Sequence, residues 1–154
     1  MENYYYDHWK DAVEEWAPIF KERWPNFTIK EIAQRGCGWS SGQTPVLIIP
    51  SFLDRMQKLR DCMGVPLHIS SWYRSPAYNQ QVASSGPEGP HTTGRAVDIR
   101  ISGGAVNELL YFAYKCGFLG IGEKQKGDYS GRFIHLDDLE DHETKGPRPH
   151  NWSY

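Results

Sequence analysis

Cysteine is scarce in this chain, and the cysteines form no chemical pattern. The 154 residues contain three, Cys37, Cys62 and Cys116, which stand far apart and include no CxxC pair. The sequence therefore offers neither a disulfide framework nor a thiolate zinc site. We expect these cysteines to fill the core.

Long apolar stretches are also missing. The longest uncharged apolar run is Pro45–Pro50, far shorter than the roughly 20 residues that a membrane-spanning helix needs. The opening residues Met1–Tyr4 lack the basic and then apolar layout of a secretory signal peptide. We therefore expect a chain that is made in the cytoplasm, carries no signal peptide and spans no membrane.

Neither sign of charge dominates the sequence. The chain has 17 Lys and Arg residues against 19 Asp and Glu residues, and its formal net charge is −2. Nothing supplies the broad positive field that non-specific nucleic-acid binding requires. We expect no nucleic-acid partner.

Hydrophobic residues make up 39% of the sequence, which is enough for the core of one compact domain. The sequence contains no internal repeat and no long linker, so we expect a single domain. Apolar residues recur at helical spacing over Asp7–Trp24, with Asp7 as the expected N-cap, and over Ile48–Met63 and Gly104–Cys116. Thr28 and Glu31 have the spacing of a capping box and predict a further short helix.

Three runs with period-two alternation predict strands: Leu67–Tyr73, Arg95–Ile101 and Arg132–Asp137. Helices separate these strands without a strict strand–helix–strand order. The pattern favours a single α+β domain with a small, mostly antiparallel sheet and helices packed on one face. The other face of the sheet is then free to carry a site.

Polar side chains interrupt the last two predicted strands at matching places. In Arg95–Ile101 the apolar side chains share one face, so Asp98 points the opposite way. The same alternation in Arg132–Asp137 puts His135 and Asp137 on the non-core face. If the two strands share a sheet, Asp98 and His135 lie on the same side of it.

His91 supplies a third candidate ligand. Gly94 permits a tight reversal that would return the His91 imidazole over Asp98. Two histidines and one aspartate with an open fourth position are typical of a catalytic zinc site. The alternative is that His91, Asp98 and His135 are a loop histidine, a solvated carboxylate and a satisfied strand histidine. The joint pattern favours the metal site.

The segment His91–Asp98, HTTGRAVD, resembles the HxxGxAxD signature of the zinc D-Ala-D-Ala carboxypeptidase family, whose members cut peptidoglycan stem peptides. Further landmarks of the family follow the same order in this chain, namely Phe27–Ile32, Ile69–Pro76 with Asn79, Phe133–Asp137 and Trp152. The resemblance covers roughly residues 26–154 and leaves residues 1–25 as an N-terminal amphipathic helical extension.

The resemblance implies a Hedgehog/DD-peptidase-like fold and a Zn²⁺ ion held by His91, Asp98 and His135. It also implies that Arg74 holds a carboxylate or carbonyl of a peptidoglycan peptide, a task that suits the planar donors of a guanidinium. The alternative for Arg74 is a salt bridge that orders the following turn. The implied reaction is metal-assisted hydrolysis of a peptide bond.

One position departs from the family pattern. Several branches place an acidic general base three residues before the last zinc histidine, where this chain has Arg132. Arginine cannot accept a proton from water. Asp137 is the expected replacement, because it projects from the same face as His135 and would act as base or orient that histidine. Weaker candidates for the base are Glu123, Asp128 and His68.

Two further segments have a functional and a structural interpretation. The charged, proline-containing tail Glu140–His150 is either a lid over the site or a solvated surface strap, and we favour the strap. Five aromatic residues would line a groove for an extended peptide or would simply pack: Trp39, Trp72, Tyr73, Tyr78 and Trp152.

The function expected from the sequence is a zinc metallopeptidase of peptidoglycan, of carboxypeptidase or endopeptidase type. The missing signal peptide suits a phage lysin or a hydrolase carried on a virion. The alternatives are a catalytically inactive zinc-containing module of a virus particle or cell-wall assembly, and a protein-binding helical domain without metal that uses Tyr4–Tyr6 and Trp9. The N-terminal helix offers a surface for an assembly partner.

Overall fold

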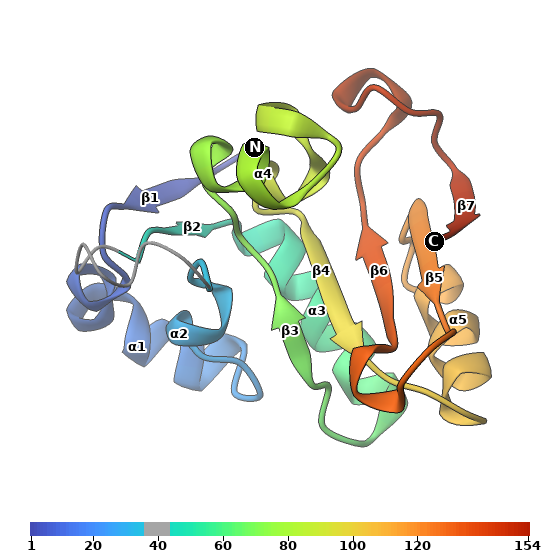
Figure 1. Ribbon diagram of the computed structural model, residues 1–154. Helices are drawn as coiled ribbons and strands as arrows, with labels where there is room; N and C mark the ends of the chain where they lie inside the picture. The colour runs from blue at the N-terminus through green and yellow to red at the C-terminus, as the bar shows by residue number, and fades with distance from the viewer. Residues whose placement is uncertain (36–43) are drawn as a thin grey trace.

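The computed structural model describes residues 1–35 and 44–154. Its centre is a five-stranded sheet in the order β3-β4-β6-β5-β7 (Figure 1). The strands are β3 (Ile69–Ser71), β4 (Ala96–Arg100), β5 (Gly120–Lys124), β6 (Phe133–Asp137) and β7 (His150–Ser153). Neighbouring strands are antiparallel except β5 and β7, which run parallel.

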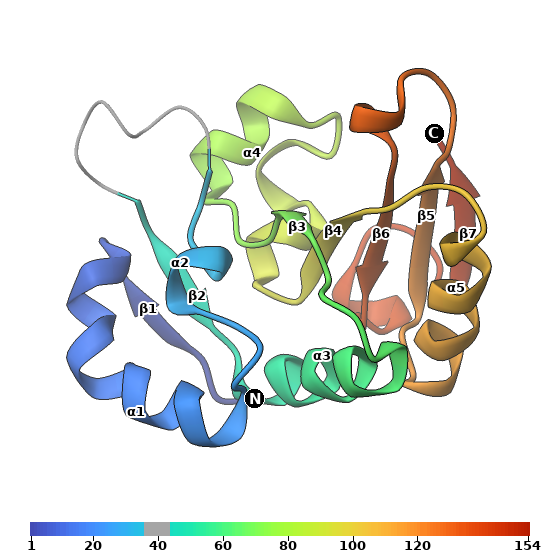
Figure 2. The same cartoon turned by 90° about the horizontal axis from the view of Figure 1, so that it is seen from below.

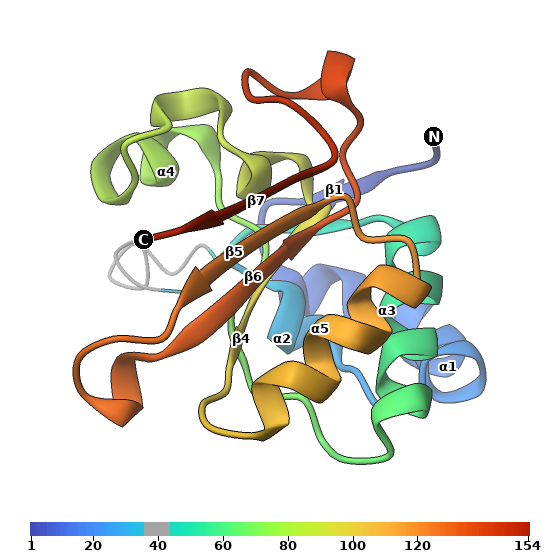
Figure 3. The ribbon, with the colours of Figure 1, turned by 90° about the vertical axis from the view of Figure 1, so that its right-hand side faces the viewer.

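Helices α3 (Pro50–Met63) and α5 (Ala105–Lys115) cover one face of this sheet (Figure 2). Helix α4 (Pro76–Val82) lies on the opposite side, as the side view also shows (Figure 3). Apolar side chains of α3, α5 and the sheet form one core, which buries its large members almost completely. The α+β class, the single domain and the mostly antiparallel sheet are confirmed.

The N-terminal part of the chain flanks the sheet on the β3 side (Figure 1). It contains β1 (Tyr4–Tyr6), α1 (Val13–Arg23) and α2 (Ile29–Ile32), and β1 pairs antiparallel with β2 (Val46–Ile48). The predicted N-cap Asp7 is wrong. The Nδ1 atom of His8 caps instead, because it accepts a hydrogen bond from the backbone of Lys10 in a 3₁₀ turn, Trp9–Ala12, that precedes α1.

One boundary of the helix predicted over Ile48–Met63 differs from the prediction for a local reason. The predicted helix from Ile48 begins at Pro50, since Ile48 belongs to β2 and Ile49 is extended, as a residue before proline tends to be. The helix ends at Gly64, whose φ of +68° forms the expected left-handed C-cap. The capping box between Thr28 and Glu31 is present at α2.

The expected core role of the cysteines is confirmed only for Cys116, which is buried; Cys62 is exposed, and Cys37 lies outside the described residues. Short 3₁₀ turns also join the elements: Gly86–Glu88, Pro90–Thr93, Tyr129–Gly131 and Asp141–Glu143. In the described part of the chain, no helix has the length and apolar character to cross a bilayer.

Candidate metal centre

The register of β4 and β6 brings two of the predicted ligands together. Asp98 and His135 are direct partners in the antiparallel ladder. Their neighbours Val97 and Ile99 turn into the core and are at most 1% exposed. Because side chains alternate along a strand, the carboxylate and the imidazole both project from the face that α3 and α5 leave uncovered.

The third ligand is positioned by a turn. His91 lies in the 3₁₀ turn Pro90–Thr93, which ends at Gly94 with a φ of +74°. This left-handed conformation favours glycine, and a side chain on Gly94 would also press against Leu47 and Ile49. The reversal expected from the sequence therefore returns the chain into β4 with the His91 ring facing Asp98.

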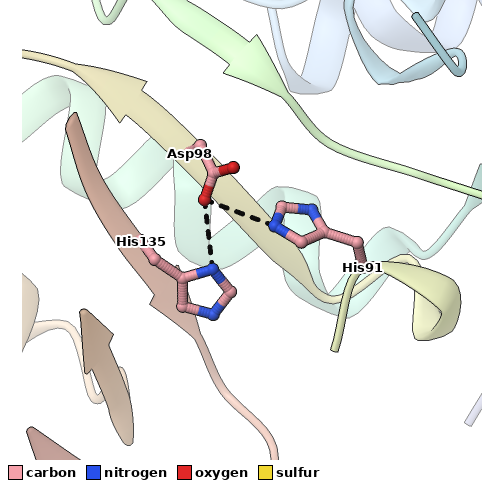
Figure 4. A group of neighbouring side chains, drawn as sticks. All are labelled: His91, Asp98 and His135. Carbon is pink, nitrogen blue, oxygen red and sulfur yellow. Dashed lines mark hydrogen bonds and ion pairs between the residues drawn. The ribbon is translucent and has the colours of Figure 1, made fainter. Parts of the chain in front are cut away.

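The three side chains converge on one point (Figure 4). Oδ1 of Asp98 lies 3.3 Å from Nε2 of His91 and 3.1 Å from Nδ1 of His135. The three ligand atoms all lie within 4.8 Å of one another, and all three residues are buried. The two rings meet edge to face, with centroids 5.1 Å apart.

Hydrogen bonds fix which nitrogen of each ring faces the centre. Nδ1–H of His91 donates to the backbone carbonyl of Trp72 over 2.6 Å, and Nε2–H of His135 donates to Oδ2 of Asp137 over 2.9 Å. With a metal bound, the other nitrogen of each ring, Nε2 of His91 and Nδ1 of His135, would offer its lone pair to the ion beside Asp98. Two neutral imidazoles and one carboxylate, each held by an outer partner, fit the donor set of a catalytic zinc ion.

The electrostatics of the site favour a charged aspartate. Burial opposes the charge of Asp98, but the adjacent His91 and His135 rings hold the pKa of Asp98 well below its ordinary value. Burial also lowers the pKa of His91, which keeps that ring neutral and able to bind a metal. For His135 burial acts in the same direction, but its bonds to Asp137 and Asp98 outweigh it and raise the pKa.

Arg74 lies beside the triad and not on the outer surface. Its guanidinium donates to Oδ2 of Asp98 at 3.2 Å, the oxygen that faces away from the imidazoles. Ser71 and Asn79 accept hydrogen bonds from its other nitrogens and fix its plane. Both interpretations offered for Arg74 therefore have a basis: it makes a salt bridge, and it also lines the pocket in front of the triad.

Asp137 lies behind His135, away from the pocket. It is fully buried, and in addition to His135 it accepts two hydrogen bonds from Arg148, at 2.9 Å to Oδ1 and 2.8 Å to Oδ2. Burial opposes its charge, but the hydrogen bonds from His135 and Arg148 lower the pKa of Asp137 to about 2. This carboxylate is placed to orient His135.

Arg148 is the residue that the sequence reading missed. Its side chain is 5% exposed, although it belongs to the tail that we expected to be a solvated strap. Through Arg148, the tail Glu140–His150 contacts Asp137 on the side of His135 that faces away from the pocket. No periodicity marks Arg148 as buried, and the one signal in the sequence is an arginine that follows the strand aspartate Asp137 by 11 residues.

A pocket of about 430 Å³ opens in front of the triad. Trp152 and Tyr154 form one wall with Phe133 of β6, and the Trp152 ring lies 5.2 Å from the His135 ring. Residues 82–85 form the opposite rim. Of the aromatic residues proposed to line a groove, Trp152 does so; Trp72 and Tyr73 are buried, Tyr78 is not in the lining, and Trp39 lies outside the described residues.

None of the weaker base candidates lines this pocket. Arg132, which replaces the acidic residue of other branches, donates to the carbonyl of Gly127 and stacks on the Tyr129 ring. Asp128 accepts from Ser130 in the same loop. Among the described residues that line the pocket, Asp98 is the one carboxylate.

The comparisons with known proteins agree with this geometry. The model of the family described as peptidase M15 matches residues 25–137, well over half of the chain. That range includes all three members of the triad and Arg74. No curated protein and no solved structure matches the chain. The family match, the ordered motifs and the converging triad show that the chain belongs to the peptidase M15 family of zinc D-Ala-D-Ala carboxypeptidase-like enzymes.

Proposed function

We propose that this protein is a zinc-dependent peptidase that hydrolyses peptide bonds in the stem peptides or cross-links of peptidoglycan. The observation that carries the proposal is the buried triad, with an outer hydrogen-bond partner on each imidazole, at the floor of a pocket that also presents Arg74. A merely structural zinc site is usually closed by four protein ligands, most of them cysteines.

Each residue has a defined task in this proposal. His91, Asp98 and His135 would hold the metal, which when bound supplies a Lewis acid for peptide hydrolysis. Arg74 is already oriented by Ser71 and Asn79 and would bind a carboxylate or the carbonyl of the substrate. Trp152 and Tyr154 supply an apolar wall that limits water on one side of the peptide.

Asp137 was expected from the sequence as the general base or as the residue that orients His135. We propose the second role. Both of its oxygens are engaged by Arg148, one of them also by His135, and it does not line the pocket. In this role Asp137 keeps the proton of His135 on Nε2, so that Nδ1 stays available to the metal.

The experiment is digestion of purified peptidoglycan with the zinc-loaded protein, followed by mass spectrometry of the released muropeptides. We expect defined peptide fragments, their loss with a chelator and their return with Zn²⁺. His91→Ala should abolish both bound zinc and release. His142→Gln, at an exposed tail histidine, is the matched control and should change neither. Intact peptidoglycan after treatment with the zinc-loaded wild type would refute the proposal.

The second candidate is a catalytically inactive zinc-containing module of a virus particle or wall assembly. The observation that favours it is the pocket lining, in which Asp98 is the one carboxylate among the described residues, together with Arg132. This candidate predicts stoichiometric zinc and binding to peptidoglycan, but no new fragments in the digestion experiment.

The predictions for the N-terminal residues and for delivery to the cell wall accompany this proposal. We propose that residues 1–25 are an extension added to the family domain, since the family match begins at residue 25. The apolar residues Trp16 and Phe20 of α1 pack into the chain's own core, so an assembly partner would use the exposed side of the helix. Delivery to the wall by a phage or virion stays a prediction.

A further inference from the structure

A second polar pocket lies on the same face of the sheet as the triad. It measures about 290 Å³ and lies between α2, β3 and the end of β4. Its polar lining is Glu31 of α2, Arg35 shortly after that helix, His68 just before β3, Ser70 of β3 and Arg100 at the end of β4. Three of these five side chains are basic. Nothing in the family match assigns this pocket a role.

In the part of the chain that the structure describes, the basic side chains of this pocket have no partner. Within the described part of the chain, Arg35, His68 and Arg100 form no side-chain hydrogen bond or ion pair. Arg55 and Arg95, in contrast, each pair with the carboxylate of Asp138. Unpaired guanidinium groups that converge on one hollow are suited to bind an anion from outside the protein.

The one acidic residue of the pocket is engaged elsewhere. Oε1 of Glu31 accepts hydrogen bonds from the backbone and the hydroxyl of Thr28, at 2.9 and 3.2 Å, in the capping box of α2. Two arginines against one glutamate leave the pocket with a net positive charge even when His68 is neutral. A carboxylate entering it would meet an excess of donors.

The position of the pocket relates it to the triad. Arg100 lies two residues after Asp98 on β4, on the same face, so their backbones are about 7 Å apart. Its register partner is Phe133, which lines the triad pocket. The two pockets therefore adjoin, and an extended peptide bound along β4 would bring a residue about two positions from the bond at the triad into the basic pocket.

We propose that Arg35, His68 and Arg100 form a subsite for a free carboxylate of the substrate, about two residues from the bond that is cut. The inference rests on the proposed peptidase function and adds a substrate class: stem peptides whose acidic residue or diamino acid carries a free carboxylate. Amidation of that carboxylate would remove both its charge and one of its acceptor oxygens.

The test compares synthetic stem peptides that differ only in amidation of one carboxylate, on the glutamate in one pair and on the diamino acid in the other. For at least one pair we expect the zinc-loaded wild type to show a kcat/KM about tenfold higher for the free acid. The double variant Arg35→Gln, Arg100→Gln should lose this preference and keep its rate on the amidated peptide.

The matched control is Arg60→Gln on α3, an arginine that also has no side-chain partner among residues 1–35 and 44–154 but lies on the helix-covered face of the sheet. It should keep the full preference. The proposal would be overturned by a double variant that still prefers the free acid, or by one whose kcat/KM falls equally on both peptides. It would also be overturned if the wild type cleaved the free acid and the amidated peptide of both pairs at equal rates. The single variants should each lose part of the preference.

Binding measurements separate this proposal from the proposed function. Calorimetry with the same peptides reports the carboxylate preference whether or not a bond is cut. Tighter binding of the free acid that depends on Arg35 and Arg100, with no cleavage of any peptide or of peptidoglycan, would support the subsite and refute the peptidase. Cleavage without any carboxylate preference in rate or binding would support the peptidase and refute the subsite.

Discussion

His91 and His135 present different nitrogens to Asp98, Nε2 from one ring and Nδ1 from the other. Each choice follows from the hydrogen bond on the far side of the ring, to a backbone carbonyl for His91 and to Asp137 for His135. A carbonyl accepts hydrogen bonds only, so it requires the proton on Nδ1 of His91. Asp137 imposes the tautomer of His135 only while it stays ionised.

His135 and Arg148 together keep buried Asp137 ionised, and the contribution of the Asp137–Arg148 pair can be tested. We expect Asp137→Asn and Arg148→Gln each to weaken zinc binding about 10- to 100-fold, because the His135 ring loses its fixed tautomer or its fixed orientation. Chelator competition monitored on folded protein measures this. The cost of Arg148→Gln in stability should be about 3 kcal/mol, since a buried carboxylate loses its bidentate cationic partner.

Arg132→Gln is the matched control for this pair. Arg132 is three residues from His135, yet its guanidinium contacts the Gly127 carbonyl and the Tyr129 ring at the surface. Zinc affinity should stay within about twofold of the wild type. Equal zinc affinity in wild type and Asp137→Asn would contradict the positioning role.

Strand periodicity predicted the side of the sheet on which Asp98, His135 and Asp137 lie, and the Gly94 turn predicted the position of His91, but neither predicted Arg148. Alternation alone placed Asp98 and His135 on the uncovered face, since one side of each strand is apolar. Arg148 follows no repeat, and its burial depends on where a proline-containing tail returns to the sheet. The position of the tail depends on the long-range pairing of β7 with β5, which no local sequence pattern predicts.

Among the elements of the five-stranded sheet, the two strands that went unpredicted have residues of poor strand propensity. β5 reads Gly-Ile-Gly-Glu-Lys, and its two glycines disfavour a strand in isolation. β7 is short and polar and is held by parallel pairing to β5. β5 forms because β6 offers an edge with which it can pair, and β5 in turn offers the edge with which β7 pairs.

The glycines of β5 have a packing reason. A Cβ on Gly122 would lie 2.5 Å from a ring carbon of Trp152, so the indole occupies the space of the missing side chain. Gly122→Ala should therefore displace Trp152, cost about 1–3 kcal/mol in stability and raise KM for peptides while zinc content stays at one equivalent. Denaturant unfolding, tryptophan fluorescence and steady-state kinetics measure these effects.

Gly131→Ala is the comparison for this strand variant, because a Cβ there meets no atom within 4 Å. It should leave both stability and KM unchanged. If Gly122→Ala behaved like Gly131→Ala, the Trp152 wall would not depend on β5.

For the molecule as a whole, the metal centre joins parts of the chain that are far apart in sequence. The ligands come from a turn and two strands, and Trp72 and Asp137 tie them to the core and to the tail. A ligand that binds only the folded state stabilises it by about 2.7 kcal/mol at 100 times its Kd. For a chain of this size that corresponds to a rise in Tm of roughly 5–10 °C.

Calorimetry with and without Zn²⁺ should show this rise for the wild type and no rise for His91→Ala. The apo protein should still unfold in one transition, since the hydrophobic core between the sheet, α3 and α5 does not include the triad. A wild-type Tm that is insensitive to zinc would show that the three side chains do not bind the ion.

The register between β4 and β6 has a consequence for how such a chain tolerates insertions and deletions. The separation of Asp98 and His135 in space is set by direct pairing and is independent of how many residues connect the two strands. Loops and helices between them can lengthen or shrink freely over evolutionary time. One residue lost inside either strand would turn every later side chain to the wrong face and dismantle the site at once.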